Sequence, residues 1–76
     1  MERVISRATV EADFLQEAIT AVGATARAFA GMIGSHERTV RRWLAGEREI
    51  PGPVLALCRL LIERPSLIRF LRLPVR

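Results

Sequence analysis

Three glycines divide the first two-thirds of the chain into short segments, and this spacing constrains the fold more than any other feature. Gly23, Gly34 and Gly46 each follow a stretch in which apolar residues recur at helical intervals. A glycine just after the last periodic residue is a typical helix stop. No segment shows the convincing apolar–polar alternation of a β-strand. The sequence therefore predicts an all-α protein, a compact bundle of about five short helices.

The glycines and the later prolines set the expected helix bounds. Thr9 and Thr25 are suited to cap the first two helices, because their hydroxyl groups accept hydrogen bonds from free backbone N–H groups. The stretch Val4–Ile5 fits an extended arm or an early helical turn. The expected helices span about Val10 to Val22, Thr25 to Gly34, Glu37 to Ala45, Val54 to Glu63 and, before Pro74, about 67 to 73. The helical period predicts that the first helix has one apolar face, formed by Val10, Phe14, Leu15, Ala18, Ile19 and Val22.

The chain has no covalent means of stabilising a small core. With 76 residues it is expected to be one domain, residues 1–76. Its single cysteine, Cys58, excludes an internal disulfide, and no Cys/His cluster suggests a metal site. A chain this short buries only about 60% of its unfolded surface. The core must therefore be almost entirely aliphatic, or be completed by a partner chain.

Apolar residues exceed what a small core needs, and the excess is concentrated in residues 54–73. We therefore expect the C-terminal helices, about 54–73, to form a symmetric homodimer. The alternative is that these side chains only close the core of the monomer. The best candidates for the dimer interface are Leu60, Leu67, Ile68, Phe70 and Leu71.

The basic residues are unusual, because all twelve are arginine and the net charge is +4. An arginine-rich binding surface and a genome that favours arginine codons both explain this composition. The charge is also unevenly distributed: residues 1–24 have an acidic excess, whereas residues 25–49 and 50–76 have a basic one. This distribution favours an anionic partner on one side of the molecule.

The run from Thr25 to Pro51, TARAFAGMIGSHERTVRRWLAGEREIP, predicts two short helices joined by about three residues, with glycine at the corner. That is the layout of a helix-turn-helix. The run resembles the helix-turn-helix of phage-repressor (Cro-like, XRE-type) DNA-binding proteins and implies a lambda-repressor-like fold. The resemblance covers about 27 residues, and the positions that carry it are Ala30, Gly34, Val40, Trp43 and Gly46.

The matched residue types have physical reasons. Ala30 allows two helices to cross closely, Gly34 supplies a left-handed corner, and Val40 with Trp43 fills the wedge between the helices. The helical period places Trp43 in the core, and stacking on a base is the alternative.

Two positions depart from the family pattern. Ala26 stands where the family commonly has a glutamine that bonds a phosphate, so Thr25 and backbone N–H groups must supply that contact. Ser35 stands where an apolar residue is usual. Either Ser35 or His36 caps the next helix, and His36 is at the matching position.

The resemblance implies that the second motif helix enters the major groove with its N-terminus first. Arginine pairs bidentately with guanine, and glutamate accepts a hydrogen bond from the amino group of cytosine. The alternative is a solvated helix face on which Glu37 and Arg41 pair four residues apart. The expected base-contacting residues are His36, Glu37, Arg38, Arg41 and Arg42. The expected phosphate-contacting residues are Thr25, Arg27 and Arg48. An N-terminal arm that carries Arg3 and Arg7 is an open alternative.

These observations predict a sequence-specific transcriptional regulator, a small dimeric repressor of prophage or accessory-operon type that binds a palindromic operator in double-stranded DNA. The alternatives are an antitoxin that represses its own operon and binds a small toxin protein, and a basic amphipathic protein of membrane surfaces or RNA. No catalytic constellation or cofactor motif is present, and Cys58 is expected to be a buried apolar side chain. Charged residues interrupt the most apolar stretch, and no export signal precedes it. We therefore expect no enzyme activity, no cofactor, no membrane insertion, and a location in the cytoplasm at the nucleoid.

Overall fold

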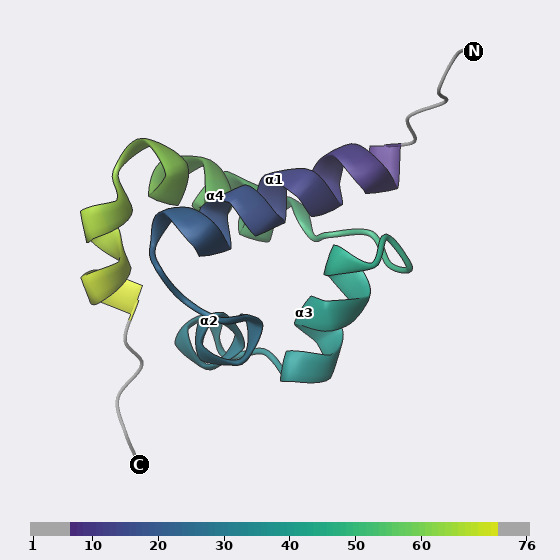
Figure 1. Ribbon diagram of the computed structural model, residues 1–76, viewed down its shortest axis with the longest axis horizontal. Helices are drawn as coiled ribbons and strands as arrows, with labels where there is room; N and C mark the ends of the chain where they lie inside the picture. Colours follow the sequence, from purple (N-terminus) through teal and green to yellow (C-terminus); the bar gives the residue numbers. More distant parts are fainter. Residues whose placement is uncertain (1–6, 72–76) are drawn as a thin grey trace.

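The computed structural model describes residues 7–71, and every regular element in that range is helical (Figure 1). The predicted all-α bundle of five short helices is confirmed. The elements are α1 (Arg7–Ala21), α2 (Ala26–Ile33), α3 (Glu37–Leu44), α4 (Gly52–Glu63) and the 3-10 helix η1 (Pro65–Leu71). No helix among these residues is both long enough and apolar enough to cross a lipid bilayer.

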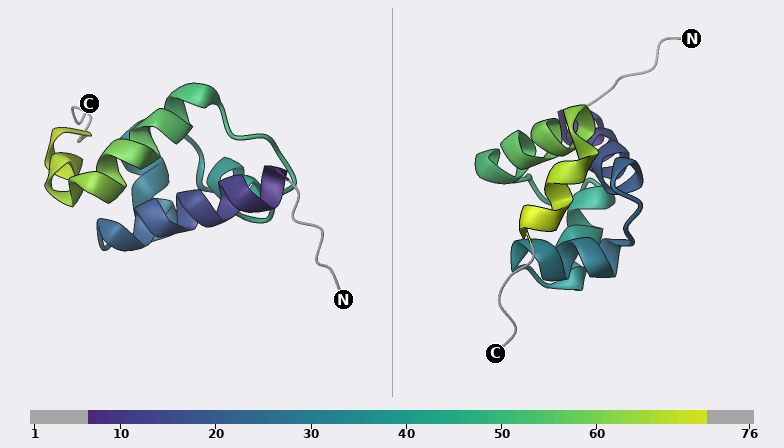
Figure 2. Two further views of the ribbon diagram at one scale, coloured as in Figure 1. Left: turned by 90° about the horizontal axis from the view of Figure 1, so that it is seen from above. Right: turned by 90° about the vertical axis from the view of Figure 1, so that its left-hand side faces the viewer.

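The four α-helices form two layers. Helices α1 and α4 lie side by side, and α2 and α3 lie beneath them, as Figures 1 and 2 show from three directions. The core lies between the layers and receives side chains from all four helices. Its largest fully buried side chains are Phe29, Leu15, Leu61, Val40 and Cys58.

Some helix ends differ from the expected ones. Helix α1 begins at Arg7, so Thr9 lies inside the helix and is not its N-cap. The guanidinium of Arg7 pairs with the Glu11 carboxylate four residues later, at 3.0 Å, and this pair supports the extra turn. Helix α4 begins two residues earlier than expected, because Pro53 is accommodated in the first turn. The positions Arg3, Val4, Ile5, Leu73 and Pro74 lie outside the described residues.

The apolar face of α1 is only partly covered. Leu15 and Ile19 are buried as expected, whereas 54% of Val10 is exposed and Phe14 is half-buried. Glu11 is buried instead, on the side of the helix nearer the core. Apolar spacing therefore identified a continuous face, of which the neighbouring helices cover only one side.

Candidate nucleic-acid interface

Gly34 forms the turn between α2 and α3. Its φ of 75° is left-handed, a conformation that costs a residue with a Cβ atom roughly 1–2 kcal/mol. The Ser35 N–H donates to the Ala30 carbonyl at 2.9 Å, and the Gly34 N–H donates to Gly31 at 3.4 Å. These two bonds form a Schellman motif, which ends α2 sharply and allows α3 to begin at Glu37. The expected left-handed corner is confirmed.

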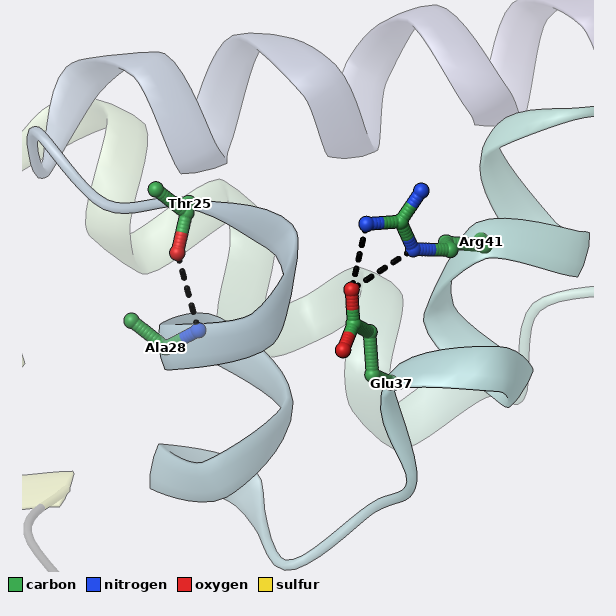
Figure 3. Close-up of polar contacts among 4 residues, drawn as sticks. All are labelled: Thr25, Ala28, Glu37 and Arg41. Atoms are coloured by element: carbon green, nitrogen blue, oxygen red, sulfur yellow. Dashed lines mark hydrogen bonds and ion pairs between the residues drawn. The ribbon is translucent and has the colours of Figure 1, made fainter.

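Thr25 caps α2 as the sequence predicts. Its Oγ1 accepts a hydrogen bond from the Ala28 N–H at 3.1 Å (Figure 3). The side chain is exposed, and its hydroxyl hydrogen is not used by this bond. Thr25 can therefore cap the helix and donate to an external anion at the same time.

His36 occupies the N-cap position of α3. Its carbonyl accepts from the N–H groups of Thr39 and Val40 at 3.0 and 3.2 Å, whereas its exposed imidazole makes no capping hydrogen bond. The first N–H groups of any helix lack intrahelical acceptors and carry the positive end of its dipole. The imidazole is therefore free to contact a partner next to this positive helix end.

Three arginines share the outer side of α3, and we call Arg38, Arg41 and Arg42 the basic face. Val40 and Trp43 are the buried residues of this helix, with exposed fractions of 0% and 5%. The rotation of about 100° per residue places Arg38 opposite them, with the other two arginines on either side. Arg38 and Arg41 are exposed and Arg42 is half-buried. The core position predicted for Trp43 is confirmed.

The three arginines differ in their ion pairs. Arg41 Nε lies 2.7 Å from Glu37 Oε2, and the two side chains point toward each other in Figure 3. Within residues 7–71, neither Arg38 nor Arg42 forms an ion pair. The pair between Glu37 and Arg41 is exposed and contributes only about 0.2–0.5 kcal/mol, so a DNA contact can replace it. Arg38 and Arg42 are available without breaking any such pair.

The remaining phosphate candidates lie on exposed positions near α2 and α3. Arg27 is on the first turn of α2, and Arg48 is in the loop between α3 and α4. Arg7 belongs to α1 and pairs with Glu11, so it is not part of an extended arm, and that expectation is wrong. Apart from Arg3, which lies outside the described residues, the other candidate DNA contacts lie on α2, on α3 or in the residues directly beside them.

The five candidate dimer residues fall into two groups. Leu67, Ile68 and Leu71 are half-buried and pack against the core of their own chain. Leu60 and Phe70 are exposed, by 54% and 71%. The first group therefore serves at least partly to close the monomer core, and the second group leaves apolar surface outside it.

Sequence reasoning missed a second surface, a groove between α1 and α4 with a volume of about 380 Å³. Apolar side chains form it together with carboxylates, and we call it the acidic groove. The signal was the interleaving of apolar and acidic residues on the outer side of α1. Its lining residues are Val10, Glu11, Asp13, Phe14, Glu17 and Leu55.

Comparison of the chain with protein families, with curated proteins and with solved structures gave no match. Among residues 7–71, no group of three or more His, Cys, Asp or Glu side chains is placed to hold a metal ion. The features of the described chain that bear on function are therefore the basic face and the short α2–α3 pair that presents it.

Proposed function

We propose that the chain binds duplex DNA through α2 and α3, which act as a helix-turn-helix, and that it is a sequence-specific transcriptional regulator. The observation that carries this proposal is the basic face. Two arginines without ion pairs in the described chain, Arg38 and Arg42, project from a short helix that follows the Gly34 turn. A protein of this kind acts in the cytoplasm, at the nucleoid.

In this proposal the first turns of α3 read bases in the major groove. Arg38 and Arg42 pair with guanine through their guanidinium groups, since each has two parallel N–H donors to offer to O6 and N7. His36 contacts a base beside the helix start. Glu37 and Arg41 exchange their mutual ion pair for base contacts, with glutamate accepting from a cytosine amino group.

Phosphate contacts position the helix and carry no sequence information. Thr25 donates its free hydroxyl hydrogen to one phosphate, next to the N-terminus of α2, where free N–H groups favour an anion. Arg27 and Arg48 supply charge at the two edges of the α2–α3 pair. The acidic side of the molecule, on α1, takes no part in this contact.

Two copies of the chain bind a palindromic operator in this proposal. Specific DNA interfaces bury about 1,000–2,500 Å² of protein surface, and a single module seldom supplies that area. Two modules on half-sites about 34–36 Å apart double the contact and reproduce the symmetry of the site. Occupying such a site is enough to block transcription, so the regulator is a small repressor.

The central experiment is selection of bound sequences from random duplex DNA. We expect enrichment of one palindrome, with guanines in each half-site. Affinity for that palindrome should fall with salt, and the slope of log K against log salt should be roughly −0.9 per phosphate neutralised. Binding without enrichment of any sequence would contradict the proposed regulator.

Alanine variants separate base contacts from phosphate contacts. We expect Arg38→Ala to cost about 1–3 kcal/mol on the selected palindrome and little on random duplex, because it removes a base contact. Arg48→Ala should weaken binding to both kinds of DNA and reduce the salt slope by about one. The matched control is Arg59→Ala. Arg59 is exposed on α4, and its Nε lies 3.8 Å from Glu63 Oε2. Equal effects of all three variants would show that only net charge matters.

A further inference from the structure

The acidic groove leaves apolar surface uncovered in the monomer. Val10 is 54% exposed, and it lies with half-buried Phe14 and Leu55 along the groove. Asp13 and Glu17 are exposed at the same groove. The groove has a volume of about 380 Å³. The groove therefore suits an occupant that is apolar at its centre and positively charged at its rim.

The groove faces away from the core side of α1. A Cβ atom added to Gly46, in the loop after α3, would lie 3.9 Å from the Ala8 Cβ atom, so Ala8 marks the side of α1 nearest that loop. Val10 and Glu17 lie roughly opposite Ala8 around the helix. An occupant of the groove thus sits on the outer side of α1.

The carboxylates determine how a second copy can bind. A symmetric contact of groove against groove would bring Asp13 and Glu17 of two chains together, and such like-charge contacts are unfavourable. The groove therefore requires a different, cationic surface as its partner.

The element η1 carries a side-chain pair with this chemistry. Phe70 is the most exposed of the large apolar side chains in the described chain, at 71%. The Arg69 guanidinium carbon lies 5.3 Å from the centre of its ring, so a cation accompanies the aromatic surface. An exposed aromatic ring with an adjacent arginine matches an apolar groove bordered by carboxylates.

We propose that the acidic groove binds η1 of a second copy of this chain. Phe70 of one protomer contacts Val10, Phe14 and Leu55 of its partner, while Arg69 approaches Asp13 and Glu17. The η1 helix of each protomer lies in the groove of the other, so the two contacts are identical and form a closed two-fold dimer. Phe70 and Val10, which are exposed in the monomer, thus belong to one interface. Formation of this dimer does not depend on DNA binding.

The test is sedimentation equilibrium of the full chain without DNA. We expect a mass of twice the 8.5 kDa monomer. Phe70→Ser should raise the dimer Kd about tenfold or more, as expected for an aromatic anchor at an interface. Glu17→Arg and Arg69→Glu should each raise it about fivefold or more, because attraction becomes repulsion. All three side chains are exposed, so the folded monomer is retained, and circular dichroism checks this.

The decisive variant combines Glu17→Arg with Arg69→Glu in one chain, which restores opposite charges across the contact. We expect its dimer Kd to return to within about threefold of the original. Glu47→Arg is the matched control, because it makes the same charge change on an exposed loop outside the groove, and it should leave the Kd unchanged. A monomeric original chain, a failure of the double variant to dimerise, or an equal effect of Glu47→Arg would each overturn the proposal. A DNA-binding failure with an intact dimer would contradict only the proposed function.

Discussion

The basic face and the acidic groove differ in whether the apolar residues of their helix are buried or exposed. On α3 the large apolar side chains Val40 and Trp43 are buried, and only charged groups project outward. On α1 the apolar side chains Val10 and Phe14 remain at the surface between carboxylates. A surface of the first kind suits a highly charged, polar partner such as a phosphate backbone. A surface of the second kind suits a partner that loses apolar area from water.

The separation of charge also keeps the two surfaces from competing. The net charge of +4 conceals a helix α1 with an acidic excess and a helix α3 with a basic excess. DNA is repelled from the outer side of α1, and an arginine-rich segment is repelled from α3. Each surface thus disfavours the partner that is proposed for the other.

The largest expected effect tests the contrast in burial directly. Trp43→Ala removes an aromatic side chain that is 95% buried, and we expect the free energy of unfolding to fall by about 3–5 kcal/mol. Phe14→Ala removes a half-buried ring at the groove and should cost roughly half as much or less. Urea unfolding followed by circular dichroism measures both. An equal cost for Phe14 would mean that the groove is part of the core and is not a surface for a partner.

The next effect concerns Cys58, in the core between the two layers. Burial raises the pKa of its thiol from 9.0 to about 11. The thiol therefore holds its proton more tightly in the folded chain than in the unfolded chain. The resulting contribution to the free energy of unfolding is fully present below pH 9 and is lost as the pH rises to about 11. We expect a loss of roughly 2–3 kcal/mol over that interval.

The composition makes this titration unusually clean. The chain has no lysine and no tyrosine, so no ε-amino or phenol group titrates in the same interval as the thiol. Unfolding curves between pH 8 and 11, with a reducing agent present, isolate the single thiol. Cys58→Ala should remove the pH dependence. An original chain with constant stability up to pH 11 would show that burial does not raise the pKa of the Cys58 thiol.

The sequence specified the basic face better than the groove, for physical reasons. Gly34 and Thr25 act through bonds to residues at most five positions away, and their roles were predictable from local sequence. Trp43 was placed in the core by its helical period. Val10 was not placed correctly, because periodicity defines which side of a helix is apolar but not how much of it a neighbouring helix covers.

The remaining differences arise from the same limit. Thr9 has the residue type of a cap, but the pairing of Arg7 with Glu11 supports a helix that starts at Arg7, three residues before the expected first residue Val10. The C-terminal apolar residues were predicted to exceed what the core needs, yet Leu67, Ile68 and Leu71 pack against the core, and only Leu60 and Phe70 of the five candidates are exposed. Their division between the monomer core and the exposed surface depends on how η1 folds back, which local spacing does not specify.

The smallest expected effect compares one glutamate from each surface. Glu37 lies in the first turn of α3 and pairs with Arg41, so Glu37→Gln loses a favourable helix-dipole interaction and an ion pair. We expect a loss of about 0.5–1 kcal/mol of unfolding free energy at low salt. Glu17→Gln, on the outer side of α1, should change stability by less than about 0.5 kcal/mol.

Salt dependence separates the two positions further. The loss from Glu37→Gln should shrink between 10 mM and 1 M salt, because the Debye length falls from about 30 to 3 Å and screens an exposed pair. Thermal unfolding at both concentrations measures this change. A salt-independent loss would mean that Glu37 acts by packing and not by charge. Ionic contacts between the protein and DNA would also weaken as salt is added. In a test of the proposed DNA binding, the affinities of the Glu37 variant and of the original chain must therefore be compared at one fixed salt concentration.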